Sequence, residues 1–137
     1  MKCIAIVDTN VLVSALLSRR DDTATVLVVG RMLAGEIVPA YSEAIMAEYR
    51  QVLRRQKFGF DSSAVHYLLS AIERFGMLVE PLPSGLTLPD MKDLPFYEVV
   101  LEKQDECAYL VTGNLKHFPK QPFVVTARQL LDILDGR

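Results

Sequence analysis

Residues 3–17, CIAIVDTNVLVSALL, contain the feature that decides the fold. Residues 3–7 are a short apolar run, typical of a strand buried on both faces, and residues 11–17 predict the start of an apolar helix. Asp8 stands between these two buried elements, where an unpaired carboxylate would cost stability. Either Asp8 or Thr9 simply caps the helix, or the acid has a chemical purpose. The second interpretation gains weight only if other acids occupy matching positions.

The composition is that of an ordinary globular protein, and the length of 137 residues predicts one domain over residues 1–137. No apolar stretch is long enough to span a membrane, and the N-terminus lacks the features of a signal peptide. We therefore expect a cytoplasmic protein with no membrane partner. The net charge of −2 argues against a protein that binds nucleic acid through an overall positive charge. It does not exclude an enzyme that acts on nucleic acid through metal ions bound by its acids.

The two cysteines, Cys3 and Cys107, have no metal-ligand spacing. Both are expected in strands, as small buried apolar residues of a protein from a reducing compartment. We therefore expect no disulfide between them.

Short apolar segments alternate with helical patterns along the chain. Strands are expected at residues 3–7, 37–40, 77–80, 109–112 and 123–125, and helices at 10–17, 23–33, 42–55, 62–75, 94–103 and 126–134. Thr23, Ser42 and Thr126 are candidate helix caps, and residues 81–89 contain three prolines and a glycine and predict a loop. This alternation predicts a three-layer α/β/α sandwich around a mainly parallel sheet. Ligands of such folds bind at the carboxyl ends of the strands.

Two acids compete in the helix that follows the second expected strand. Glu43 and Glu48 are five residues apart, so at about 100° per residue they point in different directions. Glu43 lies in the first turn, where a carboxylate favours the helix dipole without any further role. Glu48 lies in mid-helix beside the apolar stripe, which makes it the stronger candidate for the edge at which Asp8 lies.

Two further polar residues follow the same rule of placement. Asp93 stands at the start of a helix, where capping alone would explain it, and Asp90 on the preceding loop is expected to be solvated. Asn114 directly follows the fourth expected strand. If Asp8, Glu48, Asp93 and Asn114 converge at one edge of the sheet, the carboxylates would repel one another unless a divalent cation lay between them. Oxygen ligands of this kind suit Mg²⁺ or Mn²⁺.

Four segments resemble those of PIN-domain ribonucleases and occur in the same order: VDTNVLVSALL, SEAIMAEYRQVL, DLPFYEVV and AYLVTGN. Within that family, the likeness is to the toxin components of bacterial and archaeal toxin–antitoxin systems, and it covers nearly the whole chain. The resemblance implies a PIN-like fold and a metal-dependent endoribonuclease. It also implies an RNA substrate, a cognate antitoxin protein and a homodimer.

The resemblance also assigns roles to individual residues. It implies that Asp8, Glu48 and Asp93 are the catalytic acids and ligands of Mg²⁺ or Mn²⁺, which would activate a water for attack on a phosphodiester. The fourth acid of the family commonly lies in TGD or TRD. This chain has TGN, so the uncharged Asn114 takes that place. Asn10 and Thr112 match polar residues that support the site by orienting carboxylates.

The basic residues near these segments carry weaker signals. Lys116 and His117 follow Asn114 and could contact phosphate, although a surface role is about equally expected. Arg50 and Arg54 are four residues apart and share a helix face. For these two arginines a solvated face is the favoured interpretation, and contact with the RNA backbone is the alternative.

Two other functions remain open on the sequence alone. Because Asn114 replaces an acid, the chain could be a catalytically weak or inactive PIN fold that binds RNA or a protein. An acid after the first strand of a parallel α/β fold also suits a phosphoacceptor, either a receiver or a haloacid-dehalogenase-type phosphatase. The phosphatase requires a second acid two residues later, where this chain has Asn10. Metal-dependent RNA cleavage or phosphorylation of Asp8 would separate these functions.

Overall fold

The computed structural model describes residues 2–136, which form one five-stranded sheet with helices on both faces. In chain order the elements are β1 (Cys3–Val7), α1 (Thr9–Leu17), α2 (Ala24–Leu33), β2 (Ile37–Tyr41), α3 (Glu43–Leu53), α4 (Ser62–Phe75), β3 (Met77–Leu78), α5 (Leu94–Glu102), β4 (Tyr109–Val111), β5 (Val124–Val125) and α6 (Ala127–Leu134). Three short 3₁₀ turns are also present: η1 (Met91–Asp93), η2 (Gln104–Glu106) and η3 (Leu115–His117).

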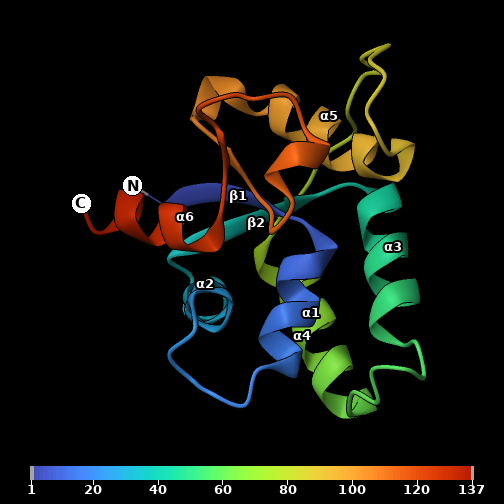
Figure 1. Ribbon diagram of the computed structural model, residues 1–137, viewed down its shortest axis with the longest axis vertical. Coiled ribbons are helices and arrows are strands. Elements are labelled where there is room, and N and C mark those ends of the chain that lie inside the picture. The colour runs from blue at the N-terminus through green and yellow to red at the C-terminus, as the bar shows by residue number, and fades with distance from the viewer. Residues whose placement is uncertain (1, 137) are drawn as a thin grey trace.

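All strand pairs in the sheet are parallel, and the strand order is β3-β2-β1-β4-β5. Figure 1 shows α5 above the sheet and α1, α2 and α4 below it, so the expected three-layer α/β/α sandwich is confirmed. The apolar run of β1 lies at the centre, where Ala5, Ile6 and Val7 are almost completely buried. None of the helices in residues 2–136 is both long and apolar enough to cross a membrane.

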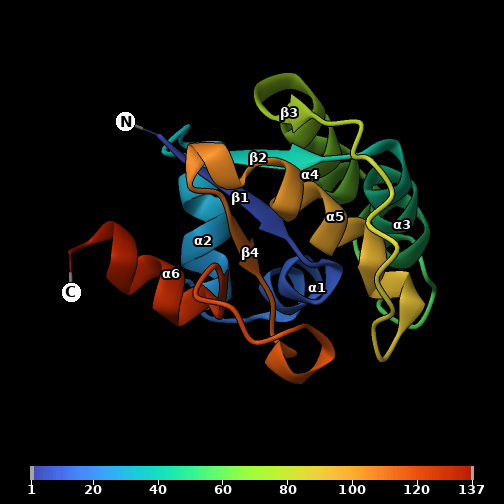
Figure 2. The same cartoon turned by 90° about the horizontal axis from the view of Figure 1, so that it is seen from above.

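The strand order reverses direction at β1. From β1 the chain builds the sheet outward through β2 and β3 in one direction, and later through β4 and β5 in the other. In parallel sheets such a reversal leaves a crevice at the carboxyl ends of the two strands that flank it. Figure 2 shows β1 and β4 side by side, leading to α1 and to the η3 turn respectively. The reversal point of this sheet therefore lies next to Asp8 and Thr112.

Several of the expected helix boundaries are explained by local hydrogen bonds. The Ser42 hydroxyl accepts a hydrogen bond from the Ile45 amide at 3.2 Å, and Thr126 forms a complete capping box. Gly35 has a φ of 82° just after α2, a conformation that glycine adopts without steric cost. Thr23 occupies the N-cap position of α2, but its side chain makes no capping hydrogen bond.

The expectation for Cys107 was wrong. Cys107 is exposed and has a left-handed backbone with φ of 56° at the end of η2, outside any strand. Its amide is bonded to the Gln104 carbonyl at 3.1 Å and the Ala108 amide to the Lys103 carbonyl at 3.3 Å, so the helical end continues and β4 begins only at Tyr109. Cys3 lies half-buried in β1, and both cysteines are free thiols.

The first expected outcome concerns Gly76, which lies where α4 meets β2. A Cβ atom at Gly76 would come within 2.5 Å of the Pro39 carbonyl oxygen and still closer to that of Ile72. Gly76→Ala should therefore lower the free energy of unfolding by about 1–3 kcal/mol. Gly30→Ala is the matched control, because open space surrounds Gly30 within α2 and alanine favours a helix by up to about 1 kcal/mol. Equal stability of the two variants in chemical denaturation would contradict this packing.

Candidate functional site

Asp8 does not act as a helix cap, although it stands at the N-cap position of α1. Its side chain makes no capping hydrogen bond to that helix. The Oδ2 atom instead accepts one hydrogen bond from the Thr112 hydroxyl at 2.7 Å and another from Asn10 Nδ2 at 3.1 Å. Asp8 is only 5% exposed. The simple capping explanation therefore fails, and the structure fixes this acid by side chains from α1 and from the end of β4.

The donors to Asp8 are themselves held in place. Asn10 Oδ1 accepts a hydrogen bond from the Gly113 amide at 3.0 Å, and the Thr112 hydroxyl accepts one from the Asn114 amide at 3.0 Å. A Cβ atom at Gly113 would lie 3.3 Å from Asn10 Oδ1, which is a tight contact. The structure thus brings both Asn10 and Thr112 onto Asp8, at the positions where the sequence placed supporting residues.

Glu48 reaches the same region from α3. Its Oε2 atom accepts a hydrogen bond from the hydroxyl of Thr9, the residue that follows Asp8. The hydroxyl of the buried Tyr49 donates a hydrogen bond to the Val7 carbonyl, which holds α3 against the end of β1. Thr9 is a site residue that the sequence reading missed, although its place directly after Asp8 was a signal.

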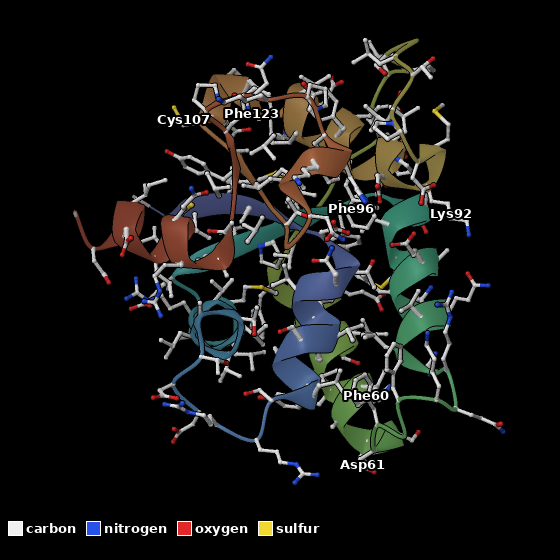
Figure 3. The ribbon with its side chains drawn as sticks, viewed as in Figure 1. Phe60, Asp61, Lys92, Phe96, Cys107 and Phe123 are labelled. Atoms are coloured by element: carbon white, nitrogen blue, oxygen red, sulfur yellow. The ribbon has the colours of Figure 1, made fainter. Side chains whose placement is uncertain are left out.

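Two observations favour Glu48 over Glu43 as the acid of this site: the packing of the neighbouring Tyr49, and the exposed position of Glu43. The Tyr49 ring lies 6.2 Å from the Phe96 ring of α5, and Figure 3 shows Phe96 in the region between α5 and α3. Glu43 lies exposed at the first turn of α3. In the described residues, no hydrogen bond joins Glu43 to Asp8, Thr9 or Glu48.

Asp93 enters the site from the start of α5. It occupies the N-cap position, but its side chain makes no capping bond. Its Oδ2 atom instead pairs with His117 Nδ1 on η3 at 3.1 Å. Asp90 caps the short turn η1 through the Lys92 amide at 3.0 Å, and Figure 3 shows Lys92 at the outer end of this turn. Asp90 is exposed, as the sequence suggested for a loop acid, and its charge also raises the pKa of Asp93.

The charges of the three acids act on one another. Burial raises the pKa of Asp8, and the charge of Asp93 raises it further, against the lowering effect of the Thr112 hydrogen bond. Burial also raises the pKa of Glu48, and the charge of Asp8 adds to that rise. For Asp93 the causes of a raised pKa are burial and the charges of Asp90 and Glu48, which the His117 contact opposes. In each of the three acids, the net effect of burial and neighbouring groups is to raise the pKa and so to disfavour the charged form.

Each of these three acids has one engaged oxygen and one open oxygen. The engaged atoms are Oδ2 of Asp8, Oε2 of Glu48 and Oδ2 of Asp93. Within residues 2–136 no side chain donates a hydrogen bond to the second oxygen of any of the three, although the backbone amide of Thr9 acts on the Asp8 carboxylate and lowers its pKa. That part of the chain also contains no fully buried side-chain oxygen without a hydrogen-bond partner. In the same residues, no lysine or arginine forms an ion pair with these acids.

The donor chemistry of these acids fits a divalent cation that keeps part of its water shell. Carboxylate oxygens with uncompensated negative charge are the ligands that Mg²⁺ and Mn²⁺ prefer. Among residues 2–136, no group of three His, Cys, Asp or Glu side chains is placed so that all three could hold one metal ion. Mg²⁺ sites commonly use only one or two carboxylates and several waters, so a closed cage is not required. Asp8 and Glu48, with Asp93 beside them, are the residues that would hold such an ion.

The other candidate residues, Asn114, Lys116, Arg50 and Arg54, make no side-chain hydrogen bond to these acids within residues 2–136. Asn114 is exposed, and only its backbone amide is bonded to Thr112. Lys116 and Arg54 are exposed as well. Arg50 pairs with Glu73 of α4 at 3.0 Å, which supports the solvated-face interpretation for this arginine.

The raised pKa of Asp8 leads to an expected pH dependence of stability. A carboxyl group whose pKa is higher in the folded state contributes stability below about pH 4, and this is lost as the pH rises through the raised value. Asp8→Asn keeps an oxygen for the Thr112 hydrogen bond and removes the charge. In chelator, this variant should be more stable than the wild type at pH 7, and the difference should shrink toward pH 4. Thermal unfolding measures this.

The control for this experiment is Asp105→Asn, at an exposed position in η2. It should not show the same gain at pH 7. An Asp8→Asn variant that is less stable than the wild type at pH 7 would contradict the buried, disfavoured charge.

Comparison with known proteins agrees with this geometry. The family model described as PIN domain matches residues 5–116, a span that contains Asp8, Glu48, Asp93 and Asn114. No curated protein and no solved structure matches the chain. PIN domains are generally metal-dependent nucleases. Since the family match covers most of the sequence, from β1 to the η3 turn, the chain belongs to the PIN-domain family.

Proposed function

We propose that this chain is a metal-dependent endoribonuclease that cleaves RNA phosphodiesters with Mg²⁺ or Mn²⁺. The observation that carries the proposal is the orientation of Asp8, Glu48 and Asp93, each of which is held through one oxygen and leaves the other open. These acids lie beside the reversal point of a parallel sheet, where such folds bind ligands. Membership of a nuclease family favours this chemistry over a phosphoacceptor.

The residues of the chain have distinct tasks in this proposal. A divalent cation, when bound, supplies an activated water and offsets the charge of the phosphodiester. Asp8 gives the site a fixed negative charge in a buried setting, where attraction for a cation is strong. Asn10 and Thr112 keep Asp8 in one orientation, and Thr9 does the same for Glu48.

The surface around the acids would meet the RNA backbone. Lys116 and Arg54 are exposed and can contact phosphate oxygens, whereas Arg50 is engaged by Glu73. We assign a weaker role to His117 in this contact, because the structure pairs it with Asp93.

The finer biological role rests on the motif resemblance. We propose that the chain is the toxin of a toxin–antitoxin pair, forms a homodimer and acts in the cytoplasm with a protein antitoxin as its partner. The two free thiols are consistent with a reducing compartment.

A second candidate is a PIN fold that binds RNA or a protein with little or no catalysis. Asn114 brings no charge to the place of the family's fourth acid, and in the described residues no group of three His, Cys, Asp or Glu side chains is placed so that all three could hold one metal ion. Cleavage assays separate the two functions.

The decisive comparison uses two glutamates of the same helix. Glu48→Gln should reduce Mn²⁺-dependent cleavage of single-stranded RNA roughly 100-fold or more, since it removes a charged ligand. Glu43→Gln should leave cleavage unchanged, because Glu43 is exposed at the first turn of α3. Mn²⁺ should also stabilise the wild type by about 2.7 kcal/mol at 100 times its dissociation constant. Loss of cleavage in Glu43→Gln with retention in Glu48→Gln would refute the assignment.

Asn114 offers a separate test of the metal site. Asn114→Asp adds a negative charge next to the Asp8 network, worth about 1 kcal/mol of attraction for a cation near the surface. The metal concentration for half-maximal cleavage should therefore fall about fivefold. Gln121→Glu adds the same charge before β5, near its amino end, and should have little effect.

Other results for Asn114→Asp would also decide between the functions. If the wild type is inert and the variant cleaves RNA, the wild-type chain is a binding module. If the variant leaves the metal dependence unchanged, Asn114 lies outside the metal site.

A further inference from the structure

The contact between His117 and Asp93 joins two elements that are remote in sequence. His117 Nδ1 lies 3.1 Å from Asp93 Oδ2, and the two residues are separated by 24 positions. Asp93 is the last residue of η1 and the N-cap residue of α5, whereas His117 closes the η3 turn after β4. The Asp93 side chain is 16% exposed, and the His117 side chain is 46% exposed. The histidine is therefore the more exposed partner of a largely shielded carboxylate.

The η3 turn that carries His117 is a fixed part of the fold. Its backbone closes through the hydrogen bond from the His117 amide to the Asn114 carbonyl at 3.0 Å. The next residue, Phe118, is buried, and its ring stacks on Tyr97 at 6.3 Å. Tyr97 lies one helical turn after Asp93 in α5, so the same two elements touch twice.

A second aromatic contact supports this arrangement. The Phe123 ring lies 6.1 Å from the ring of Tyr97, and Figure 3 shows Phe123 close to α5. Phe118 and Phe123 both follow His117 in the chain, so the segment directly after His117 is packed against α5. This packing holds the imidazole at Asp93 before any ligand binds.

The same segment also orients Asp8. Thr112, five residues before His117, donates to Asp8 Oδ2. In both pairs the donor engages one carboxylate oxygen and leaves the other open. In the family's pattern, this segment contributes a fourth acid. In this chain it has Asn114 at that place, and its Thr112 and His117 contact the carboxylates of Asp8 and Asp93.

We propose that His117 is the positioning residue of Asp93: its Nδ1–H donates to Oδ2 and thereby turns Oδ1 toward the cation that Asp8 and Glu48 share. This inference rests on the proposed metal-dependent function. It replaces a direct contact with RNA phosphate as the main task of His117. Groups that orient metal-binding carboxylates commonly change metal affinity by 10–100-fold when removed.

Side-chain geometry supplies a sharp test. The amide nitrogen of asparagine occupies nearly the position of histidine Nδ1, whereas that of glutamine corresponds to Nε2. His117→Asn can therefore keep the hydrogen bond to Asp93, and His117→Gln and His117→Ala cannot. His66→Ala, at the exposed second histidine of the chain, is the matched control.

The measurement is calorimetric titration of each metal-free protein with Mn²⁺ at pH 8, alongside RNA cleavage. His117→Ala and His117→Gln should bind Mn²⁺ about tenfold more weakly, and His117→Asn should stay within about threefold of the wild type. The kcat for RNA should follow the same order, with KM little changed, because the histidine acts through Asp93. His66→Ala should match the wild type.

Two kinds of result would overturn the inference. Unchanged or tighter Mn²⁺ binding in His117→Ala would show that the imidazole does not orient a ligand, and equal weakening in the Asn and Gln variants would show that the Nδ1 hydrogen bond is not the cause. Failure of the underlying function looks different. In that case, the wild type and Asp8→Asn would bind Mn²⁺ equally, whatever residue stands at position 117.

Discussion

The fold is organised around a carboxylate at the end of its most buried strand. Asp8 follows the central strand β1 and is 5% exposed, so its charge is costly unless it is paired or used. Thr112 and Asn10 offset part of this cost through hydrogen bonds, and the network continues to the backbone of residues 113 and 114. The hydrogen bond from Tyr49 to the Val7 carbonyl then fixes α3, and with it Glu48, against the same strand end. These groups lie at the reversal of strand order between β1 and β4, the place where parallel folds of this kind bind ligands.

The acids at this reversal point raise one another's pKa values, and within residues 2–136 none of them forms an ion pair with a lysine or arginine, although the charge of Arg55 lowers the pKa of Glu48. A fold optimised for stability alone would neutralise such a cluster or replace it with apolar residues. The structure instead orients each carboxylate with a dedicated donor and leaves one oxygen open. Destabilising charge that is held in a fixed geometry is typical of functional sites, because a ligand of opposite charge relieves the repulsion when it binds. This is the physical basis for proposing a cation site in a member of the PIN-domain family.

Much of the fold could be predicted from the sequence, because strand and helix patterns are local. Helical phase favoured Glu48 over Glu43, and Glu48 is the acid that accepts a hydrogen bond from Thr9. The partners of the acids could not be predicted in this way. Thr9 and Glu48 are 39 residues apart and Asp93 and His117 are 24 apart, and such contacts depend on how packed elements are aligned. Cys107 was misplaced because the helical end after α5 extends one turn further than the apolar pattern indicated.

The central claim is that Asp8, Glu48 and Asp93 share one cation through their open oxygens. Anomalous diffraction at the manganese edge, from crystals soaked in Mn²⁺, tests this most directly. The account predicts a peak about 2 Å from Asp8 Oδ1, with the open oxygens of Glu48 and Asp93 coordinated directly or through one water. The contradicting result is a cation bound elsewhere, for example at Glu43, with the space beside Asp8 empty at a saturating Mn²⁺ concentration.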